Sequence, residues 1–350
     1  MKKKVTFILG GLSRGGAEKV VSVLANDYYS KGWDVDIILL LLYEVGYELN
    51  ENIKIIDFTN KGKLRVFNIP YWIKSIRNYV KCSNTDIVIS FVARINIITQ
   101  IACINLKKRV IVSERNDPRN DGRSILVDIL TKILYPQASQ VIFQTEYAKN
   151  YFQNLNNSVV IPNPIQIYAH ASLVKSDKIV TVGRLAKQKN QELLIEAFKQ
   201  VAKDNPQYKL EIYGDGNCKK ILLNKIKMYD LEDNVFLQGN VQNIHERISD
   251  AKIFVLSSNY EGLSNALLEA MMMGIPCVST NCSGIDEYVK NRIDGTLVPV
   301  GDSVKLAKAI NELIADSELR EKYSQQAIIN SSKFKVENII NEWKICIERD

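Results

Sequence analysis

Histidine is scarce in this chain, and long apolar runs are lacking. Two histidines, His170 and His245, occur among the 350 residues, so a histidine-based mechanism is unattractive. The longest apolar run, residues 37–43, is far shorter than the roughly 20 residues that a membrane-spanning helix needs. The lysines at 2–4 precede an apolar stretch that stops at Gly10, which predicts a first strand rather than a signal peptide.

Metal-ligand spacing is lacking as well. The six cysteines, at positions 82, 103, 218, 277, 282 and 346, are scattered, and no two of them have Cys-x2-Cys spacing. They are typical of reduced, structural thiols in the cytosol. Asp34 and Asp36 form an Asp-x-Asp pair, but the pair enters a predicted strand, and we expect it to be a solvated edge. The sequence therefore predicts no metal site and no cofactor.

Charge is unevenly distributed along the chain. Residues 1–165 carry 22 Lys and Arg against 14 Asp and Glu, whereas the remainder carries 24 against 25. The whole net charge of +7 therefore belongs to the first half. Either nucleic acid or an anionic membrane surface would explain such an asymmetry.

Strand-like and helical patterns alternate throughout, which predicts an α/β fold with two doubly wound parallel sheets. The predicted strands of the first half are 4–9, 35–41, 53–56, 86–91, 109–113 and 140–143. Those of the second half are 179–182, 209–213, 235–238, 253–257, 277–279 and 295–298. Pro162 and Pro164 favour an extended hinge between the halves. We therefore predict domains at 1–165 and 166–335, followed by an amphipathic terminal helix within 336–350.

The segment 259–276 is the most informative stretch. Apolar residues before it predict a buried strand at 253–257, and residues 266–273 predict a helix that ends at Gly274. Glu261 then lies at the carboxyl end of a strand, where open α/β sheets bind ligands. Glu269 lies between one and two turns into the helix, and the N–H groups around 263–265 form an anion site. One carboxylate for a sugar, one for a ribose and amides for a diphosphate would suit a nucleotide-sugar.

Three further loops follow predicted strands. Gly15 and Gly16 end a glycine-rich turn after the first strand, and we favour a phosphate-facing loop over a plain tight turn. Arg184 and Lys189 follow the strand 179–182, where a cationic pair suits a diphosphate, although a basic loop by itself is usually solvated. Gly214 follows the strand 209–213 and is expected to let the backbone approach a nucleotide.

Four segments, 10–19, 182–190, 212–216 and 281–287, occur together with the pair Glu261-x7-Glu269. This set resembles the retaining glycosyltransferases of the GT-B fold, and specifically their large family 4. The resemblance implies two Rossmann-like domains that face a cleft, with the terminal helix crossing back to the first domain. It also implies that 1–165 binds the acceptor and 166–335 binds the nucleotide-sugar.

The resemblance assigns roles in the donor site. It implies that Arg184 and Lys189 bind the diphosphate, that Glu261 positions the sugar hydroxyls and that Glu269 holds the ribose. The loop that contains Val241 resembles the segment that holds the base, and UDP is the most frequent donor nucleotide in the family. The donor contacts that it implies are Gly15, Gly16, Arg184, Lys189, Gly214, Val241, Glu261, Gly262, Leu263, Ser264 and Glu269.

The chain departs from the family pattern after its fifth predicted strand. Many relatives have a histidine directly after the Ser-Glu at that position, whereas this chain has Arg115. We expect Arg115 to contact a donor or acceptor phosphate in place of the histidine, and Glu114 to act as a structural acceptor.

Basic residues dominate the segment 61–81, which contains no acidic residue. On a helix that begins after Pro70, Trp72 lies on an apolar stripe, whereas Lys74, Arg77 and Lys81 lie on the opposite stripe. Such a helix is suited to an anionic lipid headgroup layer and to a lipid-linked acceptor. One alternative is an ordinary helix that covers its domain. The other is a nucleic-acid binder, although no known nucleic-acid motif occurs.

Together these features predict a metal-independent glycosyltransferase that moves a hexose or N-acetylhexosamine from a UDP-sugar with retention. The resemblance implies the acceptor: relatives in capsule, exopolysaccharide and N-glycan-type pathways motivate a polyprenyl-diphosphate-linked saccharide in surface polysaccharide or glycan synthesis. The expected location is cytoplasmic, peripherally bound to the inner face of the cell membrane. Two alternatives remain open: a GT-B nucleotide-sugar epimerase or hydrolase, and a non-catalytic basic module that binds membrane or nucleic acid.

Overall fold

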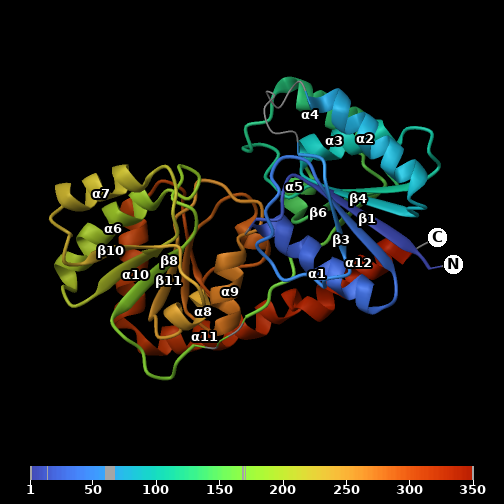
Figure 1. Cartoon of the computed structure of the whole chain (residues 1–350). Coiled ribbons are helices and arrows are strands. Elements are labelled where there is room, and N and C mark those ends of the chain that lie inside the picture. The colour runs from blue at the N-terminus through green and yellow to red at the C-terminus, as the bar shows by residue number, and fades with distance from the viewer. Residues whose placement is uncertain (1, 14, 60–67, 168, 170, 349–350) are drawn as a thin grey trace. The chain divides into compact units, whose positions relative to one another are not determined.

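The computed structural model describes all residues except 1, 14, 60–67, 168, 170 and 349–350 (Figure 1). The chain forms two compact units. The first consists of Met1–Pro164 together with Val336–Asp350, and the second is the continuous segment Ile165–Lys335.

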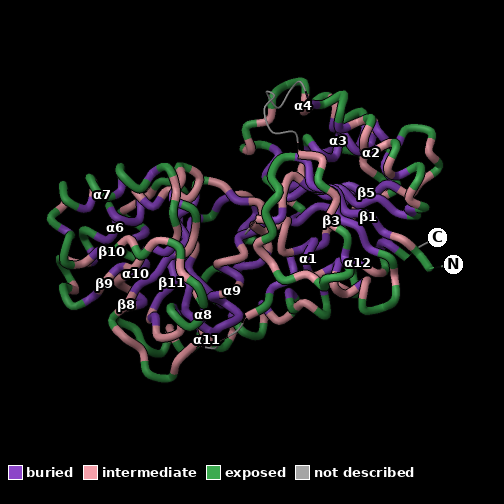
Figure 2. The backbone as a smooth tube through the Cα atoms, in the orientation of Figure 1, coloured by how far each residue is buried: buried purple, intermediate pink, exposed green. Residues whose placement is uncertain are grey.

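The first unit is built on a parallel sheet of seven strands in the order β3-β2-β1-β4-β5-β6-β7. The strands are β1 (Lys4–Leu9), β2 (Asp34–Leu39), β3 (Lys54–Asp57), β4 (Ile87–Phe91), β5 (Arg109–Ser113), β6 (Gln140–Phe143) and β7 (Ser158–Val160). Its central strands are apolar and buried, because helices cover both faces of the sheet (Figure 2).

The helices of the first unit lie on two sides of this sheet (Figure 1). They are α1 (Gly16–Ser30), α2 (Ile69–Cys82), α3 (Ala93–Cys103), α4 (Ile125–Leu134), α5 (Glu146–Lys149) and α12 (Val336–Glu348), with a short 3-10 turn η2 (Tyr135–Gln137). Side chains of α1 and α12 share one apolar cluster with the sheet. Side chains of α2, α3 and α5 form another cluster with the same strands.

The second unit contains a parallel sheet of six strands in the order β10-β9-β8-β11-β12-β13. The strands are β8 (Lys178–Val182), β9 (Lys209–Tyr213), β10 (Val235–Gly239), β11 (Ile253–Leu256), β12 (Cys277–Thr280) and β13 (Thr296–Val298). The helices are α6 (Gln191–Asp204), α7 (Lys219–Met228), α8 (Ile244–Ile248), α9 (Asn265–Met273), α10 (Ser303–Ala315) and α11 (Ser317–Ser331), with 3-10 turns η3 (Ile285–Glu287) and η4 (Ser332–Phe334).

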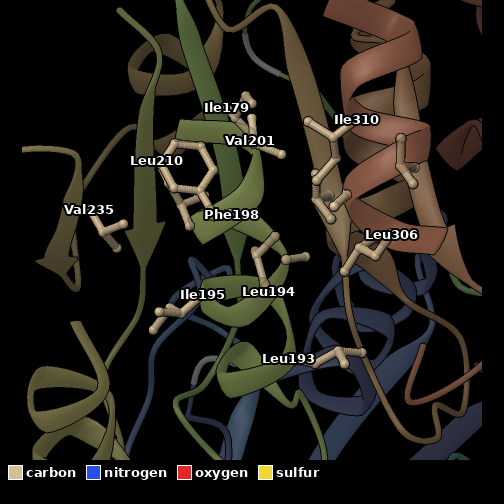
Figure 3. Packing of buried hydrophobic residues seen from close by; sticks show 14 of the residues in the cluster. Ile179, Leu193, Leu194, Ile195, Phe198, Val201, Leu210, Val235, Leu306 and Ile310 are labelled. Atoms are coloured by element: carbon tan, nitrogen blue, oxygen red, sulfur yellow. The ribbon is translucent and has the colours of Figure 1, made fainter. Parts of the chain in front are cut away.

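Two apolar clusters hold the second unit together. In one, Leu194 and Phe198 of α6 and Ile310 of α10 pack with Leu210 of β9 (Figure 3). In the other, α8, α9 and α11 contribute side chains from the opposite face. The expectation of two doubly wound parallel sheets is therefore confirmed.

Three details of the first unit differ from the sequence-based expectation. Helix α3 was not predicted, and residues 158–160 of the predicted connector region form the edge strand β7, which pairs with β6. The expectation that Asp36 lies on a solvated edge is wrong. It is buried, its carboxylate pairs with Lys4 Nζ at 2.6 Å, and it accepts a hydrogen bond from Tyr79 Oη.

Helix α12 completes the core of the first unit. Its apolar stripe, Ile339, Trp343 and Ile347, is buried in the same cluster as β1 and α1. The Trp343 ring stacks on Phe91 of β4 with ring centroids 6.0 Å apart. Arg109 on β5 also donates hydrogen bonds to two carbonyl oxygens near the end of this helix. The helix therefore belongs to the first unit although it follows the second one in the chain.

Truncation of Trp343 should destabilise the first unit selectively. Trp343→Ala is expected to lower its free energy of unfolding by about 3–5 kcal/mol, because a large buried aromatic side chain leaves a cavity. Ile345→Ala, on the same helix but 57% exposed, should change it by less than about 0.5 kcal/mol. Urea denaturation of the three proteins measures both effects, and equal stability of the two variants would contradict the described packing.

Candidate active site

The strand order of the second unit fixes where a ligand site is expected. The chain runs from β8 outward to β9 and β10, and then returns to place β11 on the other side of β8. At this reversal the loops that leave β8 and β11 lie at the same edge of the sheet, and such switch points are where open α/β sheets bind ligands. The loop 183–190 follows β8, and the loop 257–264 follows β11.

Hydrogen bonds join these two loops to each other. Ser257 Oγ donates to the carbonyl oxygen of Lys189 at 3.0 Å, and the Asn259 N–H donates to that of Gln188 at 2.8 Å. In return, Gln188 Nε2 donates to the carbonyl oxygen of Tyr260 at 3.1 Å. The loops therefore form one structural unit, which the sequence motifs by themselves do not indicate.

Glu261 and Lys189 meet where the loops join. Glu261 is 4% exposed, and its Oε1 lies 2.7 Å from Lys189 Nζ. Ser258 Oγ donates a second hydrogen bond to the same oxygen. Thr280 Oγ1 in turn donates a hydrogen bond to the Ser258 carbonyl oxygen at 2.6 Å. The structure thus brings two predicted site residues into a single ion pair. Arg184, in the same loop, is exposed.

Helix α9 begins at Asn265, after Glu261, Gly262, Leu263 and the N-cap residue Ser264. Its N-cap residue Ser264 makes no side-chain cap hydrogen bond, and Ser264 Oγ is buried without a hydrogen-bond partner among the described residues. The first N–H groups of a helix lack partners within the helix and carry a partial positive charge. This end of the helix is therefore suited to an anion.

Glu269 lies on α9, and its Oε2 is 3.3 Å from His245 Nε2. The Glu269 side chain is 16% exposed. The helix that carries His245, α8, has only five residues, yet His245 is buried. Sequence reasoning missed this pairing because only the packing of α8 against α9 brings the two side chains together.

Val241 lies in the loop between β10 and α8. It lines a surface hollow of about 550 Å³ together with Gln242, Asn243, Glu246 and Arg247. The hollow thus adjoins the short helix whose His245 contacts Glu269.

Gly214 allows the loop after β9 to contact the loop after β8. A Cβ atom there would lie 2.1 Å from the carbonyl oxygen of Gly183, and the residue has a φ of +130°. The close approach made possible by this glycine is therefore to the loop after β8, which the sequence did not indicate. The approach of the Gly214 backbone to a nucleotide is not tested by this contact and stays a prediction.

The remaining predicted site residues lie in the first unit. Gly15 is the N-cap of α1, and the carboxylate of Glu18 lies so close that a Cβ at Gly15 would be 2.3 Å from it. Gly16 is the first residue of that helix. Both glycines follow β1, beside the point where the strand order of the first sheet reverses between β1 and β4.

Glu114 and Arg115 follow β5 and are both buried. Glu114 Oε2 pairs with Arg123 Nη2 at 3.1 Å and accepts from Tyr135 Oη at 2.8 Å, which agrees with a structural acceptor. Burial raises the pKa of the Glu114 carboxyl, and the Arg123 charge opposes that shift.

Arg115 makes its described contacts within the first unit. Its Nη1 donates to Asn163 Oδ1 at 3.0 Å, and its guanidinium lies 5.3 Å from the centre of the Trp343 ring. Burial lowers the pKa of this guanidinium, and the adjacent Glu114 opposes that shift. Contact of Arg115 with a phosphate therefore stays a prediction.

The second unit and the whole chain resemble known proteins. Residues 165–329 match the family described as Glycosyl transferases group 1. The amylovoran biosynthesis glycosyltransferase AmsD of Erwinia amylovora is 28% identical to this chain over 97% of this chain and 98% of that protein. A Campylobacter jejuni enzyme, GalNAc-alpha-(1->4)-GalNAc-alpha-(1->3)-diNAcBac-PP-undecaprenol alpha-1,4-N-acetyl-D-galactosaminyltransferase, is 28% identical over 97% of both chains.

Solved structures share the fold. Anabaena HepE, crystallised in complex with UDP, aligns with a TM-score of 0.84 and 20% identity over 99% of this chain and all of that chain (100%). The chain is a glycosyltransferase with a GT-B fold.

Helix α2 of this glycosyltransferase corrects one expectation. Trp72 is buried, and its Nε1 donates to the Phe58 carbonyl oxygen at 3.0 Å, so its assignment as a membrane contact is wrong. Arg77 Nη1 donates to the carbonyl oxygens of Ala102 and Ile104, whereas Lys74 and Lys81 are exposed. An apolar stripe indicates that one face is covered, but it does not tell a protein core from a lipid.

Two kinds of feature are absent from the described part of the glycosyltransferase. No described helix is long and apolar enough to cross a membrane. Among the same residues, no three His, Cys, Asp or Glu side chains are grouped so that they could hold a metal ion.

Substitution of Gly214 tests the contact between the loops of this glycosyltransferase. Gly214→Ala should destabilise the second unit by well over the roughly 1–2 kcal/mol that a left-handed backbone costs, because the new Cβ collides with a carbonyl oxygen. At Gly239, also with positive φ, a Cβ would meet nothing within 4 Å, so Gly239→Ala should cost only the backbone strain. Thermal unfolding of both variants measures the difference; equal losses would contradict the described loop contact.

Proposed function

We propose that this glycosyltransferase moves a hexose or N-acetylhexosamine, with retention, from a UDP-sugar to a polyprenyl-diphosphate-linked saccharide in surface polysaccharide or glycan synthesis. The observation that carries the proposal is the placement of Glu261 and Glu269 around the N-terminus of α9 at the switch point of the second sheet. The Campylobacter relative, whose name specifies an undecaprenol-linked glycan acceptor, supports the choice of acceptor. The amylovoran enzyme supports a role in polysaccharide synthesis.

We assign one role to each part of this site. The N–H groups that begin α9, with Ser264, hold the diphosphate, and Arg184 and Lys189 neutralise the charge that grows on it as the glycosidic bond breaks. Glu261 accepts hydrogen bonds from the sugar hydroxyls, and Glu269 accepts them from the ribose. The second unit is thus the donor-binding domain, and the first unit binds the acceptor. In this scheme the leaving diphosphate deprotonates the incoming hydroxyl, and no metal ion takes part.

The ion pair of Lys189 and Glu261 gives the site a defined starting geometry. A lysine ammonium has three N–H donors, so Lys189 can keep its contact with Glu261 and still donate to a phosphate oxygen. Because Glu261 is almost fully buried, its carboxylate is held in place before the donor arrives. A charged group fixed in advance loses little freedom on binding.

The test is acceptor-dependent sugar transfer by the purified protein. With a panel of UDP-sugars and polyprenyl-diphosphate saccharides, one donor should give an elongated acceptor by mass spectrometry, and NMR of the product should show the anomeric configuration of the donor. Transfer should persist in EDTA. UDP release at the same rate without acceptor would indicate a hydrolase or epimerase instead.

Substitutions in the donor site refine this test. Glu269→Ala should weaken UDP binding by roughly 1.5–3 kcal/mol, because the ribose loses a charge-assisted hydrogen bond. Arg184→Ala and Lys189→Ala should chiefly lower kcat, since phosphate charge builds in the transition state. Lys187→Ala, an exposed residue of the same loop, is the matched control and should behave as wild type. Wild-type turnover in all the site variants would overturn the assignment.

We further propose that the protein binds an anionic lipid surface through α4 rather than through the apolar stripe of α2. Four apolar side chains of α4, Ile125, Leu126, Ile129 and Ile133, are 80%, 64%, 48% and 55% exposed. The spacing of 125, 129 and 133 places them on one face of the helix, while Thr131 and Leu134 are buried. Two features support lipid binding by this face. Its exposed apolar side chains are suited to entering the lipid, and residues 1–165 carry an excess of basic residues.

The membrane proposal makes two separable predictions for vesicle co-sedimentation. Ile129→Asn with Ile133→Asn should lower binding at least tenfold at every salt concentration, because about 1.5 kcal/mol or more of apolar burial is lost. Lys74→Gln with Lys81→Gln should lower binding only on anionic vesicles and at low salt, by about 1 kcal/mol per charge. Ile221→Asn, on an exposed position of α7, is the control. Wild-type binding by the α4 variant would exclude this face.

A further inference from the structure

His245 belongs to the shortest α-helix among the described residues of the second unit, yet is 5% exposed. Helix α8 has five residues and begins directly after the loop that contains Val241, Gln242 and Asn243. Asn243 precedes the helix with a left-handed φ of +55°. The chain therefore turns sharply between the surface hollow and His245.

Apolar contacts hold α8 in place. Ile248, one turn after His245, is 2% exposed and shares a cluster with Leu267 and Leu268 of α9. The two helices are thus joined by apolar contacts as well as by the approach of His245 Nε2 to Glu269 Oε2 at 3.3 Å. Because of these contacts, a displacement of α8 would also shift α9.

The contact with His245 restricts the conformations that the Glu269 side chain can adopt. A glutamate side chain has several rotatable bonds, and their freedom is lost when the carboxylate binds a ligand. An imidazole nitrogen packed 3.3 Å from one carboxylate oxygen restricts the side chain beforehand, and the carboxylate still has lone pairs to accept from two hydroxyl groups. Such restriction in the free protein increases affinity without a new contact to the ligand.

We propose that His245 is a positioning residue that orients Glu269 for the ribose and links it to the loop 240–243. The inference rests on the proposed donor site and deepens it: the nucleoside part of the donor is recognised by α8, α9 and the loop 240–243 as one unit. His245 itself need not touch the donor.

The test is a double-mutant cycle measured by calorimetric titration with UDP. His245→Phe, which keeps a ring but lacks the polar nitrogen that lies beside Glu269, should weaken UDP binding about tenfold and raise the donor KM to a similar extent, with kcat at saturating donor within about twofold of wild type. His245→Gln, whose amide can reach the position of Nε2, should restore affinity to within about threefold. His245→Phe combined with Glu269→Ala should bind UDP no more weakly than Glu269→Ala does.

The outcomes separate this inference from the proposed donor site. If Glu269→Ala binds UDP as tightly as wild type, the donor site itself is wrong. If Glu269→Ala weakens binding but His245→Phe does not, or if their losses add, only the positioning role is overturned. Should His245→Phe not fold, His245→Asn takes its place, because its shorter amide cannot reach Glu269 and the same tenfold loss is expected. Unchanged affinity in His245→Asn would then reject the role.

Discussion

The reversal of strand order beside β8 is the constraint on which the candidate site depends. Crossovers between parallel strands are right-handed, so the chain must leave β8 on one side and return to β11 on the other. The loops that follow these two strands then lie next to each other without a helix between them. Lys189 and Glu261, 72 positions apart, form an ion pair for this reason. The Ser257 and Gln188 side chains that join the loops stabilise a geometry that topology has already created.

The sequence predicted the parts of the fold that leave a local signal. Buried parallel strands appear as short apolar runs, so every strand of the second sheet was expected within a few residues. Helix α3 was missed because nine of its eleven residues are buried, so it has no polar stripe to show a helical period. Strand β7 was missed because it has three residues beside two prolines.

The parts of the site that escaped prediction depend on contacts between distant elements. A glycine such as Gly214 indicates that something comes close, but not that the neighbour is the carbonyl oxygen of Gly183. The periodicity of α2 indicated an apolar face, and its partner proved to be the sheet rather than a lipid. His245 has no local signal at all, since its importance depends on the packing of α8 against α9.

The position of Trp343 has a consequence for the order in which the chain can fold. The second unit is one continuous segment, whereas the first needs residues from both sides of it. During synthesis from the N-terminus, the second unit is complete before α12 has been made. The apolar face that Trp343, Ile339 and Ile347 cover stays open until then. This reverses the usual sequence, in which the N-terminal domain finishes first, and it makes the nascent first unit the species most exposed to aggregation or to chaperones.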